Sequence, residues 1–332
     1  MLLAVLAVIA GIVALVKSAD VFVEGSSGTA KYFGMSDFLI GMLILGFGTS
    51  APELLVSASA SFDGKGDLAL GNAFGSNICN IALILGVTAL IRPVTVKTAV
   101  IRSEMVGLLL VTLTTVYLLW DHIISRADAS ALLLLFAIFV IVSIRNGRKE
   151  SKAQKLQNQE PKTETKPVSL GRELLKLFAG LVVLVLSSKL LVWGAVEIAT
   201  ILEVSNLVIG LTIVAVGTSL PELASSIAAA MKGNNAMAIG NVVGSNMFNT
   251  LAVTGLAGVI QELKADPEIL VRDVGVMTTL TALLILFSAP LSKKARATGN
   301  GTVTRIEGAA LCAIYIGYTA YLICTAGHSG AA

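Results

Sequence analysis

The chain has 332 residues, of which 55% are hydrophobic and only 14% are charged, and its mean hydropathy is +0.85. This balance lies far outside that of a soluble globular domain, so water is not the main solvent of the protein. The formal net charge is only +3, and the basic residues are scattered without interleaved aromatic residues, which argues against nucleic-acid binding.

Apolar stretches separated by short polar breaks fill most of the chain. A membrane-spanning helix needs about 20 mostly apolar residues, so we predict an all-α polytopic membrane protein with about ten transmembrane helices. The first stretch lacks the basic start and the cleavage site of a secretory signal, so we expect it to be a real helix. The expected helices cover residues 2–24, 37–61, 67–91, 100–120, 128–145, 172–197, 205–231, 235–260, 269–289 and 305–325.

Residues 146–169 are rich in Lys, Gln, Glu, Thr and Pro and contain too few apolar residues to fold alone. We interpret this segment as a linker between residues 1–145, the first five-helix repeat, and residues 170–332, the second. The linker shows no calcium-loop pattern, so we expect no regulatory calcium domain in it.

The two halves contain an internal repeat. A shift of 169 positions, from Gly41 to Gly210, aligns GMLILGFGTSAPELLVSASA with GLTIVAVGTSLPELASSIAA and, without a gap, GNAFGSNICN with GNVVGSNMFN. About 20 of the 51 aligned positions that begin at Gly41 are identical. Shared hydrophobicity would match Leu and Val rather than Gly, Asn, Ser and Glu, so we infer a duplication.

Five helices in one half is an odd number, so the second half enters the membrane from the opposite side and the repeat is inverted. Counted on alternating sides, about 18 of the 24 basic residues lie on the linker side, which the positive-inside rule places in the cytoplasm. We therefore predict a multi-pass protein of the cell membrane with both termini outside. Besides the linker residues, that side holds Lys31, Arg92, Lys97, Arg102, Lys232, Lys293, Lys294, Arg296 and Arg305.

Two glutamates, Glu53 and Glu222, occupy matching places inside otherwise apolar helices. A carboxylate near the bilayer centre costs at least about 2.5 kcal/mol, so something must compensate it. A single such residue could snorkel to the interface or be protonated and packed, but its repetition in both halves favours a shared function. Hydroxyl residues precede each glutamate by three and four positions on the same helical face, namely Thr49 and Ser50, and Thr218 and Ser219.

Prolines precede both glutamates, at Pro52 and Pro221, and glycines lie just upstream at Gly46, Gly48 and Gly217. Proline removes a backbone donor, so we expect each helix to be interrupted there and to free carbonyl oxygens for a ligand. Such breaks are tolerated inside a membrane only where the backbone faces protein or water. The sequence therefore predicts two broken helices at the centre of the protein.

The following helix in each half carries a stripe of polar residues. The stripe consists of Asn72, Ser76, Asn77 and Asn80 in the first half and Asn241, Ser245, Asn246 and Asn249 in the second. Residues four apart share one face of a helix, so amide and hydroxyl oxygens line that face. For Asn72, Asn77, Asn241 and Asn246, ion binding and hydrogen bonding between helices both remain open interpretations.

The two halves together offer two carboxylates and several neutral oxygens, a set that hard cations prefer. The three cysteines lie singly in apolar stretches and the two histidines have no metal-ligand neighbours, so we expect no zinc or other Cys/His site. Two negative charges match one calcium ion, or two or three sodium ions. Competition for the same oxygens would produce antiport if only the loaded protein changes its facing direction. We expect calcium, sodium and the lipid bilayer as partners and no resident cofactor.

The motifs GTSAPE with GNAFGSNICN, and GTSLPE with GNVVGSNMFN, resemble the two α-repeats of the calcium/cation antiporter superfamily, in particular its prokaryotic sodium/calcium exchangers. The resemblance is strong over about a third of the chain and includes both motif blocks in both halves. It implies two inverted five-helix repeats, with a four-helix core that holds the ions and with the first and sixth helices sliding across it.

The resemblance also implies a ligand set. Glu53 and Glu222 would bind calcium together with the backbone carbonyls of Thr49 and Thr218, and the remaining implied ligands are Ser50, Ser76, Asn80, Ser219, Ser245 and Asn249 with the carbonyls of Gly46 and Ala215. Some relatives have an aspartate at the position of Asn249, so this chain has one carboxylate fewer than they do.

From these observations we expect a secondary active antiporter that exchanges sodium for calcium by alternating access, and no enzymatic activity. A proton/calcium antiporter is the first alternative, because a buried glutamate can exchange a proton for calcium. A gated cation channel could use the same oxygens. An intramembrane enzyme with paired carboxylates is the least favoured, because acid and base roles need different environments and the two motifs are nearly identical.

Overall fold

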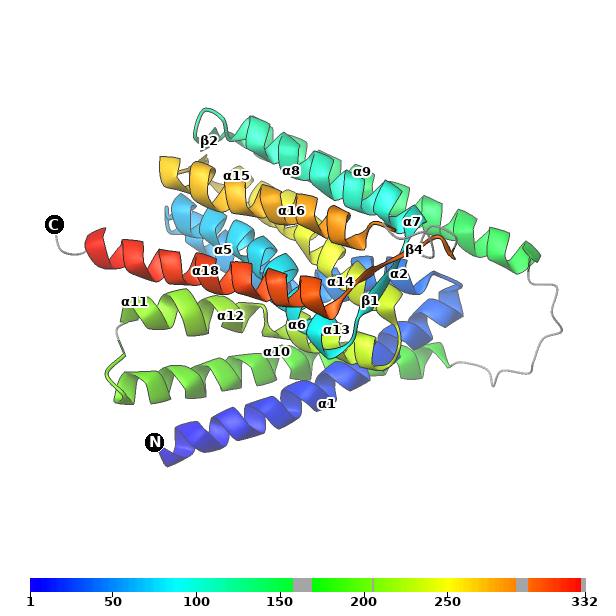
Figure 1. Ribbon diagram of the computed structural model, residues 1–332, viewed down its shortest axis with the longest axis horizontal. Coiled ribbons are helices and arrows are strands. Elements are labelled where there is room, and N and C mark those ends of the chain that lie inside the picture. The colour runs from blue at the N-terminus through cyan, green and yellow to red at the C-terminus, as the bar shows by residue number, and fades with distance from the viewer. Residues whose placement is uncertain (158–168, 205, 291–297, 330–332) are drawn as a thin grey trace.

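Long helices that run in roughly one direction form the protein, as Figure 1 shows. The computed structural model describes residues 1–157, 169–204, 206–290 and 298–329. Eight described helices are long and apolar enough to cross a membrane, and two bent pairs of helices raise the number to ten if each pair forms one span. The expected class, an all-α polytopic membrane protein with about ten spans, is therefore confirmed.

The first half contains five spans, of which the first runs nine residues past its expected end. The spans are α1 (Leu2–Phe33); α2 (Asp37–Ile40), η1 (Gly41–Leu45), α3 (Gly46–Thr49) and α4 (Ala51–Phe62); α5 (Gly66–Ile78), η2 (Cys79–Leu85) and α6 (Gly86–Ile91); α7 (Thr98–Val100), η3 (Ile101–Met105) and α8 (Val106–Leu118); and α9 (Arg126–Gln157). Elements labelled η are π-helical turns, which occur often at functional sites.

The second half repeats this order, and its π-helical turns recur at nearly equivalent places. Its spans are α10 (Leu170–Ile201); α11 (Asn206–Ile209), η4 (Gly210–Val214), α12 (Ala215–Thr218) and α13 (Leu220–Met231); α14 (Asn235–Phe248), η5 (Asn249–Val253) and α15 (Thr254–Ile260); η6 (Ile269–Val274) and α16 (Gly275–Ser288); and α18 (Arg305–Ser329).

Two short antiparallel strand pairs, which the sequence analysis did not anticipate, join loops of the two halves. Strand β1 (Val94–Lys97) pairs with β4 (Asn300–Val303), and β2 (Ile123–Ile124) pairs with β3 (Leu263–Lys264). Each pair satisfies backbone groups in a loop, so it fixes one half against the other at the ends of the helices.

Helix α1 begins and α18 ends at the left of Figure 1, and we call this the terminal end; α9 ends and α10 begins at the opposite end, the linker end. Five spans in each half produce this arrangement. The segment 146–169, expected to be a linker, is helical as far as Gln157, and residues 158–168 lie outside the described part of the chain. Lys293, Lys294 and Arg296 of the basic-residue count also lie outside it.

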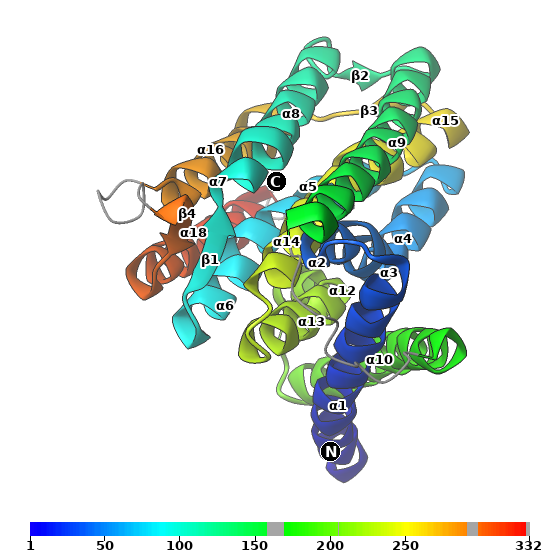
Figure 2. The same cartoon turned by 90° about the vertical axis from the view of Figure 1, so that its right-hand side faces the viewer.

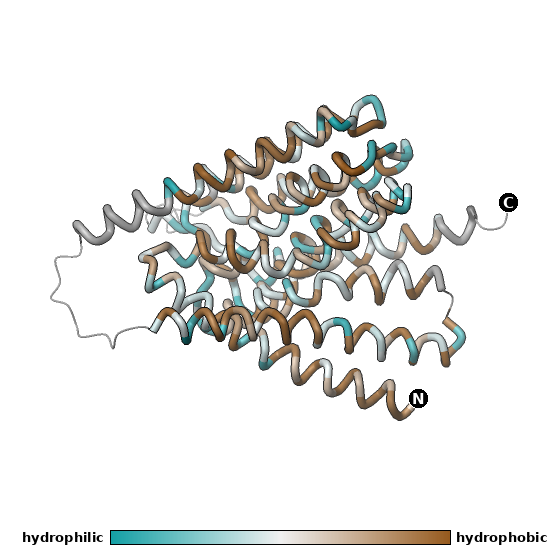
Figure 3. Tube along the Cα trace, turned by 180° about the vertical axis from the view of Figure 1, so that it is seen from behind, coloured by the Kyte–Doolittle hydropathy of each residue, from teal (hydrophilic) through white to brown (hydrophobic). Residues whose placement is uncertain are grey.

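Helices α5 and α14 lie at the centre of the fold. In the spans that contain them, 72% and 83% of the most apolar stretch of 18 residues is buried, compared with 11% of the corresponding stretch in α18. Helices α1 and α10 pack against each other on the side opposite α8 and α9, as Figures 1 and 2 show. Figure 3 shows hydrophobic residues along these outer helices and hydrophilic residues mainly near helix ends. The exterior therefore suits lipid, while the polar motifs lie inside.

The glycines of the repeated motifs pack differently in the two halves. A Cβ at Gly240 would lie 2.5 Å from the Phe38 carbonyl oxygen, and a Cβ at Gly244 would overlap the Met42 carbonyl oxygen, so α14 lies directly against the second span. At the equivalent glycines of α5, Gly71 and Gly75, a Cβ would meet no described atom within 4 Å. The motif is thus closely packed in one half and loosely packed in the other.

This difference predicts opposite effects for matched substitutions. Gly244→Ala forces α14 away from the Met42 backbone, so we expect it to lower stability by about 1–3 kcal/mol. Gly75→Ala adds a methyl group without an overlap in a helix, so stability should stay the same or rise slightly. Thermal unfolding of the purified proteins in detergent, followed by size-exclusion chromatography, measures both. Equal melting temperatures for the two variants would contradict the packing difference.

Candidate cation-binding site

The second and seventh spans are broken at serines. At Ser50 the backbone leaves the helical region (φ −83°, ψ 6°), and at Ser219 it does the same (φ −93°, ψ 8°), so the flanking helices meet at 44° and 56°. Pro52 and Pro221 lie in the first turn of the new helices, as the sequence predicted. Both glutamates therefore fall in the first turn of a helix at the centre of the protein.

Glu53 and Glu222 are buried, with 0% and 2% of their surface exposed. Neither carboxylate oxygen of Glu53 accepts a hydrogen bond from a described residue, and Glu222 Oε2 also lacks a partner. No described Lys or Arg forms an ion pair with either residue. Buried charges without a partner are costly, so this pair requires a cation or protons.

The serine at the first break reaches across between the halves. Ser50 Oγ donates a hydrogen bond to Glu222 Oε1 (3.1 Å), whereas its equivalent Ser219 Oγ has no hydrogen-bond partner among the described residues. Thr49 Oγ1 donates to its own helix at the Leu45 carbonyl (2.9 Å) and lies 3.5 Å from Asn241 Oδ1. Glu222 is therefore paired with a hydroxyl group of the other repeat, and the site is shared between the halves.

Asn80 is the second residue of η2 in the third span, and Asn249 is the first residue of η5 in the eighth span. They are 1% and 0% exposed, and none of their side-chain nitrogen or oxygen atoms has a hydrogen-bond partner among the described residues. The turn η2 packs against α13, and η5 packs against α4, so each asparagine lies on the element that faces the glutamate of the other half. Unpaired buried amides are rare, and these two fit as ion ligands.

The remaining predicted ligands are distributed unequally. Ser245 Oγ donates to the Gly46 carbonyl (3.4 Å) where α14 packs against the second span, so both are buried. Ala215 and Thr218, the equivalents of Gly46 and Thr49, are partly exposed and line a cavity of about 390 Å³ together with Ser76. The structure therefore gathers one group of ligands in the interior and leaves the other group on a cavity wall.

The stripe asparagines for which two interpretations were open form hydrogen bonds within the protein. Asn72 Nδ2 donates to the Glu53 carbonyl (3.0 Å) and to Ser57 Oγ (2.8 Å). In the second half, Asn241 Nδ2 donates equivalently to the Glu222 carbonyl (3.2 Å) and to Ser226 Oγ (2.8 Å). These amides hold the helix that carries each glutamate, so they position the site.

The other two stripe asparagines also have protein partners. Asn77 Nδ2 donates to Thr250 Oγ1 (2.8 Å) and so joins α5 to η5, whereas Asn246 Nδ2 donates to the Val242 carbonyl of its own helix (2.7 Å). Hydrogen bonding within and between helices is therefore the role that the structure supports for these side chains.

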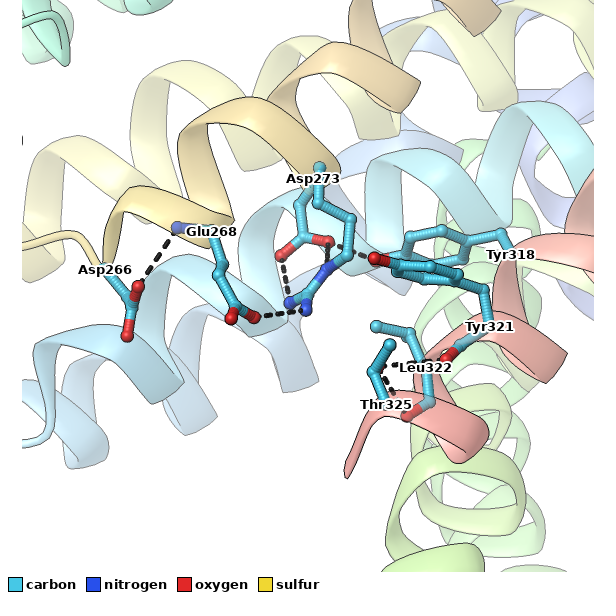
Figure 4. Close-up of polar contacts among 8 residues, drawn as sticks. Asp266, Glu268, Asp273, Tyr318, Tyr321, Leu322 and Thr325 are labelled. Carbon is cyan, nitrogen blue, oxygen red and sulfur yellow. Dashed lines mark hydrogen bonds and ion pairs between the residues drawn. The ribbon is translucent and has the colours of Figure 1, made fainter. Parts of the chain in front are cut away.

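A third buried acid, Asp273 of η6, lies in the wall of the same cavity and was not singled out from the sequence. Arg272 holds both of its oxygens, with Nε to Oδ1 at 2.7 Å and Nη2 to Oδ2 at 3.0 Å, and Tyr318 donates to Oδ1 at 2.8 Å (Figure 4). This carboxylate is satisfied by protein groups and needs no ion. The contrast shows that the unpaired oxygens of Glu53 are a specific feature of the site.

Cys79 is also buried next to a predicted ligand, although the sequence analysis expected no metal site at any cysteine. It is 2% exposed and begins the turn η2, which packs against α13. Its position one residue before Asn80, inside the GSNICN motif, was the available signal. A thiol is a soft ligand, so it adds bulk next to Asn80 without adding an oxygen that hard cations prefer.

The arrangement is suited to a hard cation. Among the described residues, no group of three or more His, Cys, Asp or Glu side chains is placed to hold a metal ion. Two carboxylates with neutral hydroxyl, amide and carbonyl oxygens instead match the preferences of calcium and sodium.

Comparison with known proteins agrees with this geometry. The family described as "Sodium/calcium exchanger protein" matches residues 3–145 and 173–324. The "Putative antiporter CaxA" of Alkalimonas amylolytica is 41% identical over 318 residues, which cover 96% of this chain and 98% of that protein. The "Sodium/calcium exchanger MaX1" of Methanosarcina acetivorans is 29% identical over 347 residues, covering 94% and 96% of the two chains.

Solved structures of the sodium-calcium exchanger NCX_Mj have the same fold. One of them superposes with a TM-score of 0.81 at 33% sequence identity and covers 97% of this chain and 99% of its own. The likeness therefore extends over both halves and includes the broken spans.

The geometry predicts that both glutamates are needed to bind calcium. In isothermal titration calorimetry of the purified protein, we expect Glu53→Gln and Glu222→Gln each to weaken calcium binding at least roughly tenfold, because each removes a charged ligand. Glu262→Gln, which neutralises an exposed glutamate in a loop, is the matched control and should bind calcium like the unsubstituted chain. Unchanged binding in Glu53→Gln would refute the assigned site.

Proposed function

The chain belongs to the sodium/calcium exchanger family, and on this premise we propose that it is a secondary active antiporter that exchanges sodium for calcium across the cytoplasmic membrane. The observation that carries the proposal is the pair of buried glutamates, one from each repeat, with three oxygens that accept no hydrogen bond from the described residues. Membership of an exchanger family also argues against the alternative of an intramembrane enzyme.

Charge balance supports a shared site for the two ions. Glu53 and Glu222 together carry two negative charges, which one calcium ion or two sodium ions neutralise. In this proposal the carbonyls of Thr49 and Thr218 complete the calcium shell. Sodium uses the hydroxyls, amides and carbonyls of Ser50, Ser76, Asn80, Ser219, Ser245, Asn249, Gly46 and Ala215. Because both ions need the same carboxylates, each displaces the other, and displacement becomes exchange when only the loaded protein changes its facing direction.

The unequal packing of two related halves supports alternating access. The cavity of about 390 Å³ separates Gly71 and Gly75 of α5 from Gly210 of the seventh span, whereas the equivalent interface of α14 is closed. We assign this conformation to the state that is open toward the terminal end. In the opposite state the two halves would exchange packing, so α5 would close against the seventh span and α14 would open.

The orientation in the membrane rests on basic residues at the ends of the helices. Arg92 and Lys232 are close together at the linker end, where Arg92 Nη1 donates to the Met231 carbonyl at 2.9 Å next to Lys232. The positive-inside rule assigns this end to the cytoplasm and both termini to the exterior. In that orientation the cavity would admit ions from outside the cell.

Ion flux tests the exchange directly. In proteoliposomes loaded with sodium, an outward sodium gradient should drive uptake of radiolabelled calcium, and a sodium ionophore should abolish it. Glu222→Gln in the same vesicles should show no uptake above empty vesicles. Uptake under a proton gradient alone would indicate proton/calcium exchange instead, and an ohmic calcium current without sodium coupling would indicate a channel.

Cross-linking tests the alternation. Gly240 lies against the second span next to Gly41, so the equivalent pair, Gly71 and Gly210, should approach in the opposite state. In a background without the three native cysteines, a Gly71→Cys/Gly210→Cys variant should form a disulfide under oxidation, with a yield that depends on which ion is bound. A yield at the level of either single variant under every ion condition would contradict the proposed closure.

A further inference from the structure

Helices α1 and α10 follow the same repeat as the ion-binding motifs. Both helices have 32 residues, and the shift of 169 positions aligns AGIVALV of α1 with AGLVVLV of α10. In this alignment Asp20 of α1 corresponds to Lys189 of α10. The same shift aligns Asp63, which ends α4, with Lys232, which ends α13. Both pairs of equivalent positions carry opposite charges in the two halves.

One of these charge pairs is formed in the structure. Lys232 Nζ lies 3.4 Å from Asp20 Oδ1 and 3.6 Å from Glu24 Oε1, and it donates a hydrogen bond to the Asp20 carbonyl at 2.8 Å. Helix α1 packs along α13 at the same place. The lysine therefore joins the α1–α10 pair to the core of the protein at the linker end.

The equivalent pair is not formed. Among the described residues, Lys189 has no carboxylate within ion-pair distance, and α10 makes only sparse contact with α4. A cavity of about 330 Å³ separates these helices, and Lys189 and Trp193 of α10 line it opposite Leu55 and Val56 of α4. The gap between α10 and α4 thus lies at the interface where the equivalent of the Asp20–Lys232 ion pair would form.

We propose that Lys189 and Asp63 form a second ion pair that holds α10 against α4 in the opposite facing state, while the pair of Lys232 with Asp20 opens. This inference rests on the alternation put forward under the proposed function. When α1 and α10 shift along the core, one ion pair breaks at the linker end and one forms at the terminal end. Each facing state then keeps one ion pair between the moving helices and the core.

The reversal of charge at both positions supports a pairing role. An acid on α1 faces a base on α13, and a base on α10 would face an acid on α4, so complementarity is kept although every charge has changed sign. If these charged residues were exposed and had no partners, a change of sign at one position would not require a change of sign at the other. A lysine inside a membrane span is also costly unless it pairs, snorkels or lines a cavity, and Lys189 lines one.

The two ion pairs are unequal, which determines the resting state. Glu24 provides Lys232 with a second carboxylate, whereas the position equivalent to Glu24 in α10 is Trp193. The linker-end pair therefore holds more strongly than the terminal-end pair. Without ions, the protein should rest open toward the terminal end, with the linker end closed.

The cross-link between Gly71→Cys and Gly210→Cys reports closure at the terminal end and serves as the test. Lys232→Met should raise its yield, because it releases the linker end. Lys189→Met and Asp63→Asn should lower the yield, because they remove the second pair. Each change should be roughly two- to fivefold, as expected for a partly exposed ion pair. The charge-exchanged variant Lys189→Asp/Asp63→Lys should restore the yield.

Two further variants separate this role from a general loss of stability. Lys17→Met removes an exposed lysine of α1 that forms no ion pair with any described residue, so its yield should not change. The double variant Asp20→Asn/Glu24→Gln removes the same ion pair as Lys232→Met. It is used in place of Lys232→Met if that variant does not fold.

The outcomes are distinguishable. Opposite signs for Lys232→Met and Lys189→Met, with restoration by charge exchange, support the two-pair device. Changes of the same sign in both, or no restoration, overturn it while leaving the exchanger proposal intact. No cross-link in any variant overturns the alternation itself and, with it, the second ion pair. Sodium-driven calcium flux, measured separately, decides whether the protein is an exchanger at all.

Discussion

Two buried carboxylates, neither of them in an ion pair with a Lys or Arg that the structure describes, form the constraint on which the rest of this structure depends. Glu53 and Glu222 lie in a low-dielectric interior, which favours binding of cations or protons at the site. Asp273 shows the alternative, because Arg272 and Tyr318 satisfy both of its oxygens. The site retains its unsatisfied charge where the protein could have neutralised it, and this allows an ion to be bound and then exchanged.

The surrounding polar residues keep this arrangement rigid. The helix breaks place both glutamates in a first helical turn, where free backbone N–H groups favour negative charge. Asn72 and Asn241 then hold the backbone of the glutamates from the neighbouring helices. A carboxylate that could turn toward solvent or toward a hydroxyl on its own helix would no longer face the ligands of the other repeat. The hydrogen bonds thus support binding without taking up the carboxylate oxygens.

Nearly identical motifs in the two halves adopt different packing, and the proposed alternation rests on this difference. Gly244 is pressed against the Met42 backbone, whereas its equivalent, Gly75, borders a cavity. In the proposed alternation both motifs form the tight contact in turn, which requires the tight and the loose arrangement to differ little in free energy. The asymmetry of ion pairs at Lys232 and Lys189 follows the same pattern on the outer helices.

Much of this could be read from the sequence because it depends on local chemistry. Pro52 and Pro221 cannot donate a backbone hydrogen bond in a helix interior, so the breaks just before them were predictable. The ten spans and the repeat follow from hydropathy and from aligned Gly, Asn and Glu residues. The roles of the stripe asparagines were not predictable, because an amide that binds an ion and an amide that joins helices look alike until its neighbour is known. Cys79, Asp273 and the strand pairs β1–β4 and β2–β3 also depend on segments far apart in the chain.

The sequence by itself determined the solvent of the protein, the duplication, the position of the two acids and the oxygen chemistry around them, because these depend on residue type and spacing. Only the tertiary structure decided which acid is left without partners, which amides are used for support and which interface is closed. Those outcomes depend on contacts between the two repeats. Identical local sequences cannot distinguish a closed interface from an open one, since the difference lies in the helix that each copy meets.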